Sequence, residues 1–271
     1  MQLSELGEVG LLAELERRGL AQRIEHDAAE LDHGFVVTQD ALVEGVHFRL
    51  DWISWRDLGW RAAAVNLSDL AASGADPDGL IVSLAAPGET RVEDVLELYE
   101  GIAETSVPVL GGDTNAAESV VLSVTALGRA ERVPGRAGAL PGDELVVTGA
   151  LGAAAAAFRR SAFVRPPLRL SEGKELARHA HALIDLSDGL AVDAAHIAGR
   201  SRCCLVIELE RVPLADGAEL DDVGFGEDYE LLAAVADPGR YAVVGRCEEG
   251  EGVVLTLRGE PYELGGWEHF R

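Results

Sequence analysis

The sequence LIDLSDGLAVD, residues 183–193, combines an apolar run with polar residues at the point where that run ends. The run stops at Asp185, and Ser187, Asp188 and Gly189 follow before a stretch that reads as a helix. A strand ending at Asp185 and a helix starting near Ser187 would aim two carboxylates and a hydroxyl at one point, beside the N–H groups of the helix N-terminus. The simpler interpretation, an ordinary N-cap at Ser187 or Asp188, explains one residue well and the pair poorly.

Strand-like and helix-like segments alternate along the rest of the chain, without a low-complexity linker or a short repeat. This pattern predicts an α/β (α+β) architecture. Thr90 and Glu93 have the spacing of a capping box at the start of one helix. The expected helices cover residues 4–19, 57–73, 91–105, 151–160, 172–182 and 188–199. The expected strands cover residues 35–38, 80–85, 107–110, 120–127, 144–149, 203–209, 229–236, 240–247 and 252–258.

A turn-rich patch, RVPGRAGALPGD at residues 132–143, separates two halves that both show this alternation. Its prolines and glycines favour a connection over a helix or a strand. The chain of 271 residues is also long enough for two domains. The sequence therefore predicts domains at residues 1–138 and 139–271.

The net charge of −24 excludes binding to nucleic acid or to an anionic membrane through diffuse electrostatic attraction. Only one of the 23 basic residues is a lysine, Lys174, and its context SEGKEL is not a P-loop. A protein of this composition would bind phosphates through divalent metals held by carboxylates. No apolar run approaches the roughly 20 residues that span a bilayer. The acidic N-terminus does not resemble a secretory signal, so we expect a cytoplasmic protein.

The cysteines are Cys203, Cys204 and Cys247, an odd number without a CxxC pair. This pattern favours buried structural thiols in a reducing compartment over a disulfide or a zinc site.

Three more segments place aspartates beside small or hydroxyl residues. In VVTQDALVEGVHF (36–48) an apolar strand runs into Thr38, Gln39 and Asp40. A hydroxyl and a carboxylate at a strand end can both face a hard cation, although a turn aspartate that caps its own backbone is the simpler interpretation. In NLSDLAASGADP (66–77) Asp69 lies on an apolar helix, where a buried carboxylate needs a metal or an arginine as its partner. A partly exposed aspartate explains that segment about as well.

In VLGGDT (109–114) a strand ends in Gly-Gly-Asp-Thr. Gly112 and its neighbour let the backbone approach a phosphate, and Asp113 can hold a metal that bridges it. A plain β-turn would look the same. Together with Asp27, Asp40, Asp69, Asp185 and Asp188, the pattern predicts two or more Mg²⁺ ions that hold a nucleotide triphosphate.

Taken in order, these motifs resemble the thiamine-monophosphate kinase family, whose superfamily includes aminoimidazole ribonucleotide synthetase and selenophosphate synthetase. The resemblance runs from GEVGLL near residue 7 to GWEHF at the C-terminus. VEGVHF and GEDYEL favour the thiamine-phosphate branch. The motifs are HDAA (26–29), VVTQDALVEGVHF, NLSDLAASGADP, VLGGDT, DLSDGL and GEDYELL (226–232).

The resemblance implies Mg²⁺ ligands, nucleotide contacts and substrate contacts at matching positions. The implied magnesium ligands are Asp27, Thr38, Gln39, Asp40, Asp69, Asp113, Asp185 and Asp188. The implied ATP contacts are Gly112, Asp113, Arg136 and Ser187, and the implied thiamine-phosphate contacts are His47, Glu227 and Trp267. From the residues alone, a surface histidine, a solvated glutamate and a core tryptophan would be the simpler interpretation of the last three.

The resemblance also implies an aminoimidazole ribonucleotide synthetase-like fold of two α/β domains, with the N-terminal sheets of a homodimer pairing into a barrel-like core. It implies direct in-line transfer of the ATP γ-phosphoryl group to thiamine monophosphate, without a covalent enzyme intermediate and without a catalytic residue distinct from the metal ligands.

The chain departs from the family at two motif positions. His26 stands first in the segment that is usually GDDAA, and Gln39 stands where threonine is common. These departures leave open a sister enzyme of the superfamily with another substrate, or a non-catalytic nucleotide-binding regulator. The selenophosphate branch is disfavoured because no cysteine precedes Cys203.

Overall fold

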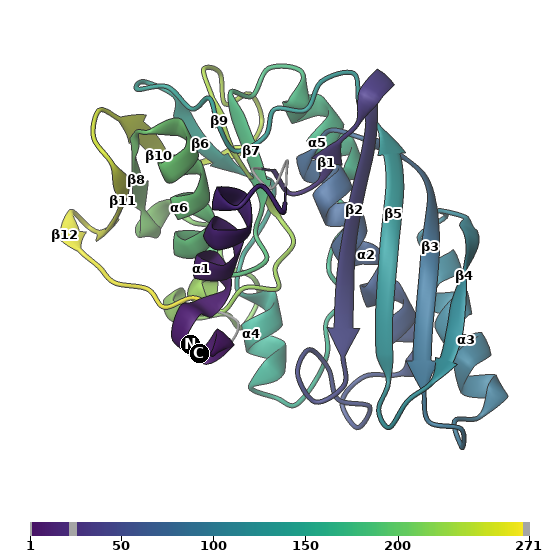
Figure 1. Cartoon of the computed structure of the whole chain (residues 1–271). Coiled ribbons are helices and arrows are strands. Elements are labelled where there is room, and N and C mark those ends of the chain that lie inside the picture. The colour runs from purple at the N-terminus through teal and green to yellow at the C-terminus, as the bar shows by residue number, and fades with distance from the viewer. Residues whose placement is uncertain (1, 22–25, 268–271) are drawn as a thin grey trace.

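The structure is a computed structural model that describes residues 2–21 and 26–267. Two β-sheets lie side by side with helices packed against them, as Figure 1 shows. The α/β class predicted from the alternating pattern is confirmed. In the described part of the chain, none of the helices combines the length and the apolarity that crossing a membrane requires.

The first sheet has the strand order β1-β2-β5-β3-β4, and only the β3–β4 pair is parallel. Its strands are β1 (Ala29–Glu30), β2 (Phe35–Val43), β3 (Asp76–Ala86), β4 (Val109–Ala116) and β5 (Val121–Arg129). Helices α2 (Trp55–Ala72) and α3 (Val92–Ala103) cover one face of this sheet (Figure 1). Among the described residues, no helix lies against the opposite face (Figure 1).

Strand β2 is longer than the four residues expected, since it continues to Val43. Thr38, Gln39 and Asp40 therefore lie inside the strand and not at its end. Successive side chains of a strand point to opposite faces. Thr38 is buried on the face toward α2 and Asp40 lies on the same face, whereas Gln39 is exposed on the opposite face.

Strand β4 also differs from the prediction, because it runs through the Gly-Gly-Asp-Thr segment to Ala116. The segment is neither a strand end nor a turn. Gly112 is required by packing within the sheet, since a Cβ at this position would lie 1.7 Å from the carbonyl oxygen of Val82 on β3. β4 is the edge strand and all its residues are exposed.

Helix α2 is the central helix of the molecule and most of its residues are buried. It begins at an N-cap serine, Ser54, whose Oγ accepts a hydrogen bond from the backbone N–H of Asp57 at 3.0 Å. Its alanines allow close packing. Helix α5 (Leu170–Ala177) crosses it so closely that a Cβ on Gly173 would lie 2.1 Å from the carbonyl oxygen of Ala71.

The second sheet has the order β12-β11-β8-β10-β6-β9-β7. Its strands are β6 (Glu144–Val147), β7 (Ala182–Asp185), β8 (Cys204–Glu208), β9 (Leu231–Val235), β10 (Ala242–Glu248), β11 (Gly252–Leu257) and β12 (Glu260–Pro261). The accompanying helices are α1 (Leu3–Arg17), α4 (Ala153–Phe158) and α6 (Leu190–Ser201), with the 3₁₀ turns η2 (Leu209–Arg211) and η3 (Leu220–Gly224). The 3₁₀ turn η1 (Asp32–Gly34) connects β1 to β2 in the first sheet. The domain boundary predicted near residue 138 falls between the last strand of the first sheet and β6, and it stays a prediction.

The hydrophobic core has one cluster under each sheet and a third between the two halves. The third cluster joins Ala71 and Ala72 of α2 to Leu176 of α5 and to Leu183 and Leu231 of the second sheet. Cys203 and Cys247 are buried free thiols and Cys204 is a half-buried one, as expected for structural cysteines. The halves thus pack through small apolar side chains along α2.

Three predicted helix ends are wrong. Thr90 does not cap α3, because that helix begins one residue later, after Arg91, and the backbone N–H of Thr90 bonds Pro87 in a turn. The helix expected over 172–182 ends at Ala177, since residues 182–185 form β7. Neither Ser187 nor Asp188 caps α6.

The N-cap position of α6 is Gly189, with φ +116°. The orphan N–H groups there are satisfied by Asp193 from inside the helix. Its Oδ2 accepts hydrogen bonds from the backbone N–H groups of Asp188 and Gly189 at 3.1 and 3.0 Å. The cap of α6 is therefore supplied by Asp193 and not by Asp188.

Candidate active site

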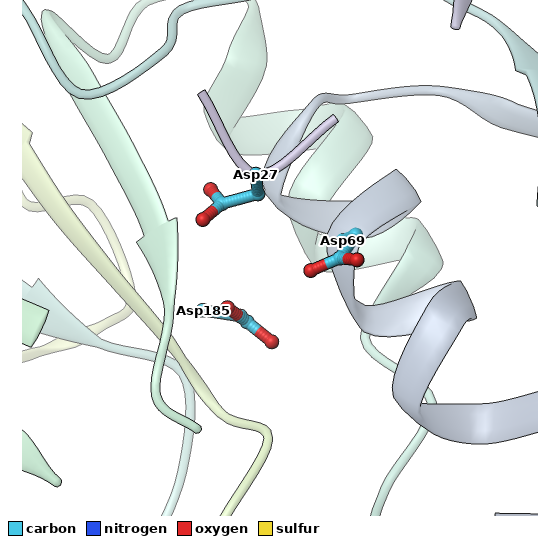
Figure 2. Close-up of side chains that lie close together, drawn as sticks. All are labelled: Asp27, Asp69 and Asp185. Atoms are coloured by element: carbon cyan, nitrogen blue, oxygen red, sulfur yellow. The ribbon is translucent and has the colours of Figure 1, made fainter. Parts of the chain in front are cut away.

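Three carboxylates from distant parts of the sequence meet where the two halves of the molecule join. Asp27 precedes β1, Asp69 lies near the end of α2, and Asp185 is the last residue of β7. Each offers an oxygen atom, and these atoms all lie within 4.8 Å of one another. Figure 2 shows the three side chains gathered around one space, with Asp69 on the helix and Asp185 at the end of the strand. The fold therefore assembles three of the aspartates that the sequence singled out.

Neighbouring side chains hold each carboxylate in place. Ser68 Oγ donates a hydrogen bond to Asp185 Oδ2 at 2.7 Å, which ties α2 to β7 across the two halves. Thr38 Oγ1 is in hydrogen-bond contact with Asp69 Oδ2. Arg136 donates to Asp27 Oδ1 from Nη2 at 2.6 Å and from Nε at 3.1 Å.

Burial and mutual repulsion disfavour the charged forms of these carboxylates. Burial raises the pKa of Asp27, although the nearby Arg136 opposes the shift. Burial raises the pKa of Asp69 well above its ordinary value, and the charges of the neighbouring Asp40 and Asp185 add to the increase. Burial and the charge of Asp27 raise the pKa of Asp185 to about 8. Buried like charges at this separation need a cation or protons to balance them.

The donor set fits a hard divalent cation. It consists of carboxylate oxygens with a hydroxyl, Thr38, in contact with one of them. Mg²⁺ prefers such oxygen ligands and shares its coordination sphere with the phosphates of a nucleotide. A bound cation would also offset the repulsion between the carboxylates, which adds to the effect of burial on their pKa values. The residues present therefore fit magnesium.

Asp40 and Asp188 extend the acidic cluster. The backbone N–H of Asp40 donates to Asn66 Oδ1 at 3.0 Å, which fastens β2 to α2. Burial raises the pKa of Asp40, a hydrogen bond with Asp69 lowers it, and the charges of Asp188 and Asp27 raise it again. Asp188 thus lies within electrostatic reach of the cluster.

Gln39 and Asp113 are not brought to this cluster by the fold of one chain. The Gln39 side chain accepts a hydrogen bond from Thr125 Oγ1 at 3.1 Å on the far face of the sheet. Asp113 pairs with Ser83 on β3 and faces the same side as Gln39. Three strand spacings separate β4 from β2, about 14 Å at roughly 4.8 Å each. Their roles as metal ligands, and that of Gly112 as a nucleotide contact, stay predictions.

The GEDYELL motif lies alongside the DLSDGL motif. β7 and β9 pair antiparallel, and backbone hydrogen bonds at 2.8 Å extend the contact from Glu227 N to Ser187 O and from Tyr229 N to Leu186 O. Glu227 and Tyr229 have φ values of +63° and +52°. Non-glycine residues in this region cost about 1 kcal/mol or more each and cluster at functional sites. The Glu227 side chain reaches α2, where it accepts a hydrogen bond from Arg61.

His47 and Glu227 lie at opposite ends of one arginine, Arg61 of α2. Arg61 Nη2 donates to Glu227 Oε2 at 2.5 Å, and Nη1 donates to the carbonyl oxygen of His47. His47 Nδ1 accepts the backbone N–H of Val43 at 3.0 Å, so the neutral ring carries its proton on Nε2. Burial raises the pKa of Glu227, and Arg61 lowers it. Two residues predicted to contact the substrate are therefore neighbours.

Trp267 is the last described residue, and the structure brings it beside the acidic cluster. Its backbone N–H donates to the carbonyl oxygen of Asp188 at 2.9 Å, and its side chain is 50% exposed. An exposed indole at this place is not the core tryptophan of the simpler interpretation. It is a ring that a ligand can contact.

The sequence did not single out several residues that complete the site. In the sequence, Arg61 has the context of an ordinary residue of an amphipathic helix, and Ser68 is distinguished only by its position before Asp69. An aromatic group also went unnoticed: the rings of Trp52 and Phe158 are 5.4 Å apart, and those of Phe158 and Phe225 are 5.2 Å apart. Phe225 precedes the GEDYELL motif directly, which was the one available signal.

Comparison with known proteins places this arrangement in a defined class. Residues 25–130 match the family model described as "AIR synthase related protein, N-terminal domain". These residues carry Asp27, Thr38, Asp40 and Asp69. The first half of the chain thus contains an AIR synthase-related N-terminal domain.

Relatives that cover most or all of the chain identify its family. Thiamine-monophosphate kinase of Aquifex aeolicus is 32% identical over 310 residues, covering 100% of both chains. The same enzyme of Rhodopirellula baltica is 36% identical over 231 residues, covering 79% of this chain and 72% of the relative. A solved structure described as "AaThiL complexed with AMPPCP and TMP" matches with a TM-score of 0.91 and 33% identity, covering 99% of each chain. The chain belongs to the thiamine-monophosphate kinase family.

Proposed function

We propose that this chain transfers the γ-phosphoryl group of ATP to the phosphate of thiamine monophosphate, which yields thiamine diphosphate and ADP. The carrying observation is the group of Asp27, Asp69 and Asp185, brought together from both halves of the chain. A relative solved with AMPPCP and TMP supports the choice of substrates. Carboxylates that gather metal and nucleotide phosphates are what such a transfer requires.

Asp27, Asp69 and Asp185 would hold Mg²⁺, with Thr38, Asp40 and Asp188 around them. When bound, the metal supplies charge neutralisation for the phosphates and for the transition state. The protein residues fix where the phosphates can lie. Ser68 and Arg136 support this role because each orients one of the carboxylates.

The reaction needs no protein nucleophile. An oxygen of the acceptor phosphate forms a bond to the γ-phosphorus, the bond to the β–γ bridging oxygen breaks, and that oxygen leaves with ADP. The acceptor oxygen is already ionised, so a strong general base is unnecessary. The chain contributes alignment, exclusion of water and charge balance. This accounts for a site that is rich in carboxylates. The single lysine of the chain, Lys174, forms an ion pair with Asp76 and is not one of the described site residues.

The two substrates would lie at opposite ends of the site. Arg136 and Ser187 mark the nucleotide end, since Arg136 contacts Asp27 and Ser187 lies between Asp185 and Asp188. The acceptor end is marked by His47, Glu227 and Trp267. In the aromatic group, Trp52 lies near His47 in the sequence and Phe225 lies near Glu227, and Phe158 at the end of α4 packs between their rings. Such rings suit the pyrimidine and the cationic thiazolium of thiamine.

We also propose that two copies of the chain pair through the open face of the first sheet. This face carries the exposed side chain of Ile81, and the neighbouring edge strand exposes Val109 and Leu110. Exposed apolar side chains on one uncovered surface favour an interface. A two-fold partner would also bring Asp113 of the partner subunit toward Gln39, since both point from this face. Light scattering of wild type and Ile81→Arg tests this: a dimer that the substitution dissociates is expected, and a monomeric wild type contradicts it.

Product analysis tests the reaction itself. Purified protein is incubated with ATP, Mg²⁺ and thiamine monophosphate, and thiamine diphosphate is assayed directly. We expect product that disappears when the metal is chelated. Absence of product with Mg·ATP still bound would favour a sister enzyme with another acceptor or a nucleotide-binding regulator. His26 and Gln39 would then be the first residues to revert to the family pattern.

A further inference from the structure

Arg61 is a buried cation whose hydrogen-bonding capacity is only partly used. It is 6% exposed, and its Nη1 and Nη2 donate to the carbonyl oxygen of His47 and to Glu227. Within the described part of the chain, its Nε is buried and has no hydrogen-bond partner. A buried donor without a partner costs about 1–3 kcal/mol, more for a charged group. Such an atom calls for a ligand.

The position of Arg61 on α2 relates it to the metal-binding end. Ser68 follows seven residues later, two helical turns on, and therefore faces nearly the same side of the helix. Ser68 bonds Asp185. Arg61 thus faces the junction between the halves, roughly 10 Å along the helix axis from the carboxylates. This offset separates it from Arg136, which contacts Asp27.

The electrostatic surroundings of Arg61 need an explanation. Its carboxylate partner, Glu227, also feels the charges of Asp188 and Asp40, which raise its pKa. An acceptor phosphate brought into this region would meet the same repulsion. A fixed guanidinium is the group that recognises phosphate with directed N–H donors. An arginine here offsets the repulsion at the place where the acceptor must enter.

We propose that Arg61 binds the phosphate of the acceptor through its unpaired Nε–H and, at the same time, holds His47 and Glu227 in position. The proposal rests on the proposed function, because it assigns a phosphorylated acceptor to this end of the site. Arg61 is then the residue that distinguishes a phosphorylated from an unphosphorylated acceptor. Its contact with Glu227 stabilises the left-handed backbone there, φ +63°.

The test compares two ligands that differ only in the phosphate. Calorimetry measures the affinity of thiamine monophosphate and of thiamine for wild type and Arg61→Gln, in Mg²⁺ buffer. Loss of a charged hydrogen bond is worth about 1.5–3 kcal/mol. Arg61→Gln should therefore weaken thiamine monophosphate about 10- to 100-fold more than it weakens thiamine, whose affinity falls only as far as His47 and Glu227 lose their support. The affinity for Mg·AMPPCP should not change.

Arg56→Gln is the matched control. Arg56 lies on the same helix but forms exposed ion pairs with Glu100 and Glu104. This control should bind both ligands like wild type. Because Arg61→Gln leaves Glu227 buried without its cation, the double variant Arg61→Gln/Glu227→Gln removes both charges together. If neither folds, Arg61→Lys repeats the comparison with the positive charge retained and the planar donor group removed.

The outcomes separate the two proposals. If wild type makes thiamine diphosphate but Arg61→Gln weakens thiamine and thiamine monophosphate equally, Arg61 is only structural and the assignment is overturned. If Arg61→Lys keeps the wild-type ratio of the two affinities, the directed donor is unimportant and the assignment also fails. If wild type neither binds thiamine monophosphate nor makes product, the proposed function itself is wrong.

Discussion

Replacing Asp185 by asparagine should stabilise the metal-free protein while it abolishes activity. Asp185 is 4% exposed and accepts a hydrogen bond from Ser68 Oγ at 2.7 Å. An asparagine oxygen can accept the same bond and removes one charge from the cluster with Asp27 and Asp69. The cluster is arranged for a cation, so without one it opposes folding. The charge of Asp185 is therefore required for activity but lowers the stability of the metal-free protein.

The magnitude follows from the pKa of Asp185, raised from 3.8 to about 8. A raised pKa means that the folded state keeps a proton that the unfolded state releases, so stability falls as pH rises from about 4 to about 8. At about pH 7.5 this linkage is at most about 5 kcal/mol, at 1.36 kcal/mol per pH unit. Because Asp27 and Asp69 relax the repulsion by sharing protons, we expect Asp185→Asn to gain about 2–3 kcal/mol.

The assay is urea unfolding of wild type and Asp185→Asn, with EDTA and with Mg²⁺, at about pH 5 and about pH 8. The advantage of the variant in EDTA should be small at the lower pH and full at the higher one. Magnesium should stabilise wild type more than the variant. Asp216→Asn is the control, since Asp216 is exposed and the charge change is the same. A variant that is less stable than wild type in EDTA at about pH 8 would refute the reasoning.

Three further outcomes follow from the same site. Asp188→Asn should reduce turnover by several orders of magnitude with an unchanged unfolding midpoint, measured by product assay and circular dichroism; near-normal activity would remove Asp188 from the metal-binding group. Chelation of Mg²⁺ should weaken ATP binding sharply in equilibrium dialysis, because Arg136 is already paired with Asp27; unchanged binding would contradict a metal-held nucleotide. Burial raises the pKa of Asp228 to about 7, so the stability of wild type relative to Asp228→Asn should fall between about pH 4 and pH 7 and then level off; a flat difference in urea unfolding would show that Asp228 does not titrate there.

The fold class and the acidic segments could be predicted because both leave local signals. Alternating apolar runs mark strands and helices whatever their partners are. An aspartate such as Asp69 in an apolar helix, or Asp185 at the end of an apolar run, conflicts with its surroundings unless it has a partner. The structure brings both of these aspartates, with Asp27, to one point. Such local conflict is the signal that a sequence can carry.

Arg61 and the aromatic group could not be predicted because their partners are distant in the chain. Arg61 contacts Glu227 across 166 positions, and nothing near Arg61 in the sequence distinguishes it from the exposed Arg56 on the same helix. Burial separates the two, and burial depends on how the second half packs against α2. The full length of β2 could not be predicted for a related reason. Its polar residues look like a turn until β5 pairs with the whole strand.

The pleat of β2 sets the limit on what one chain can assemble. Gln39 stands between two residues of the acidic site, Thr38 and Asp40, yet the alternation of the strand sends its side chain to the opposite face. Asp113 shares that face by its register with Ser83. A family resemblance transfers residues by their order in the sequence and carries no information about the face on which each one lies. If Gln39 and Asp113 bind metal together, a second copy of the chain must supply one of them, and the activity must then fall when the open face of the sheet is disrupted.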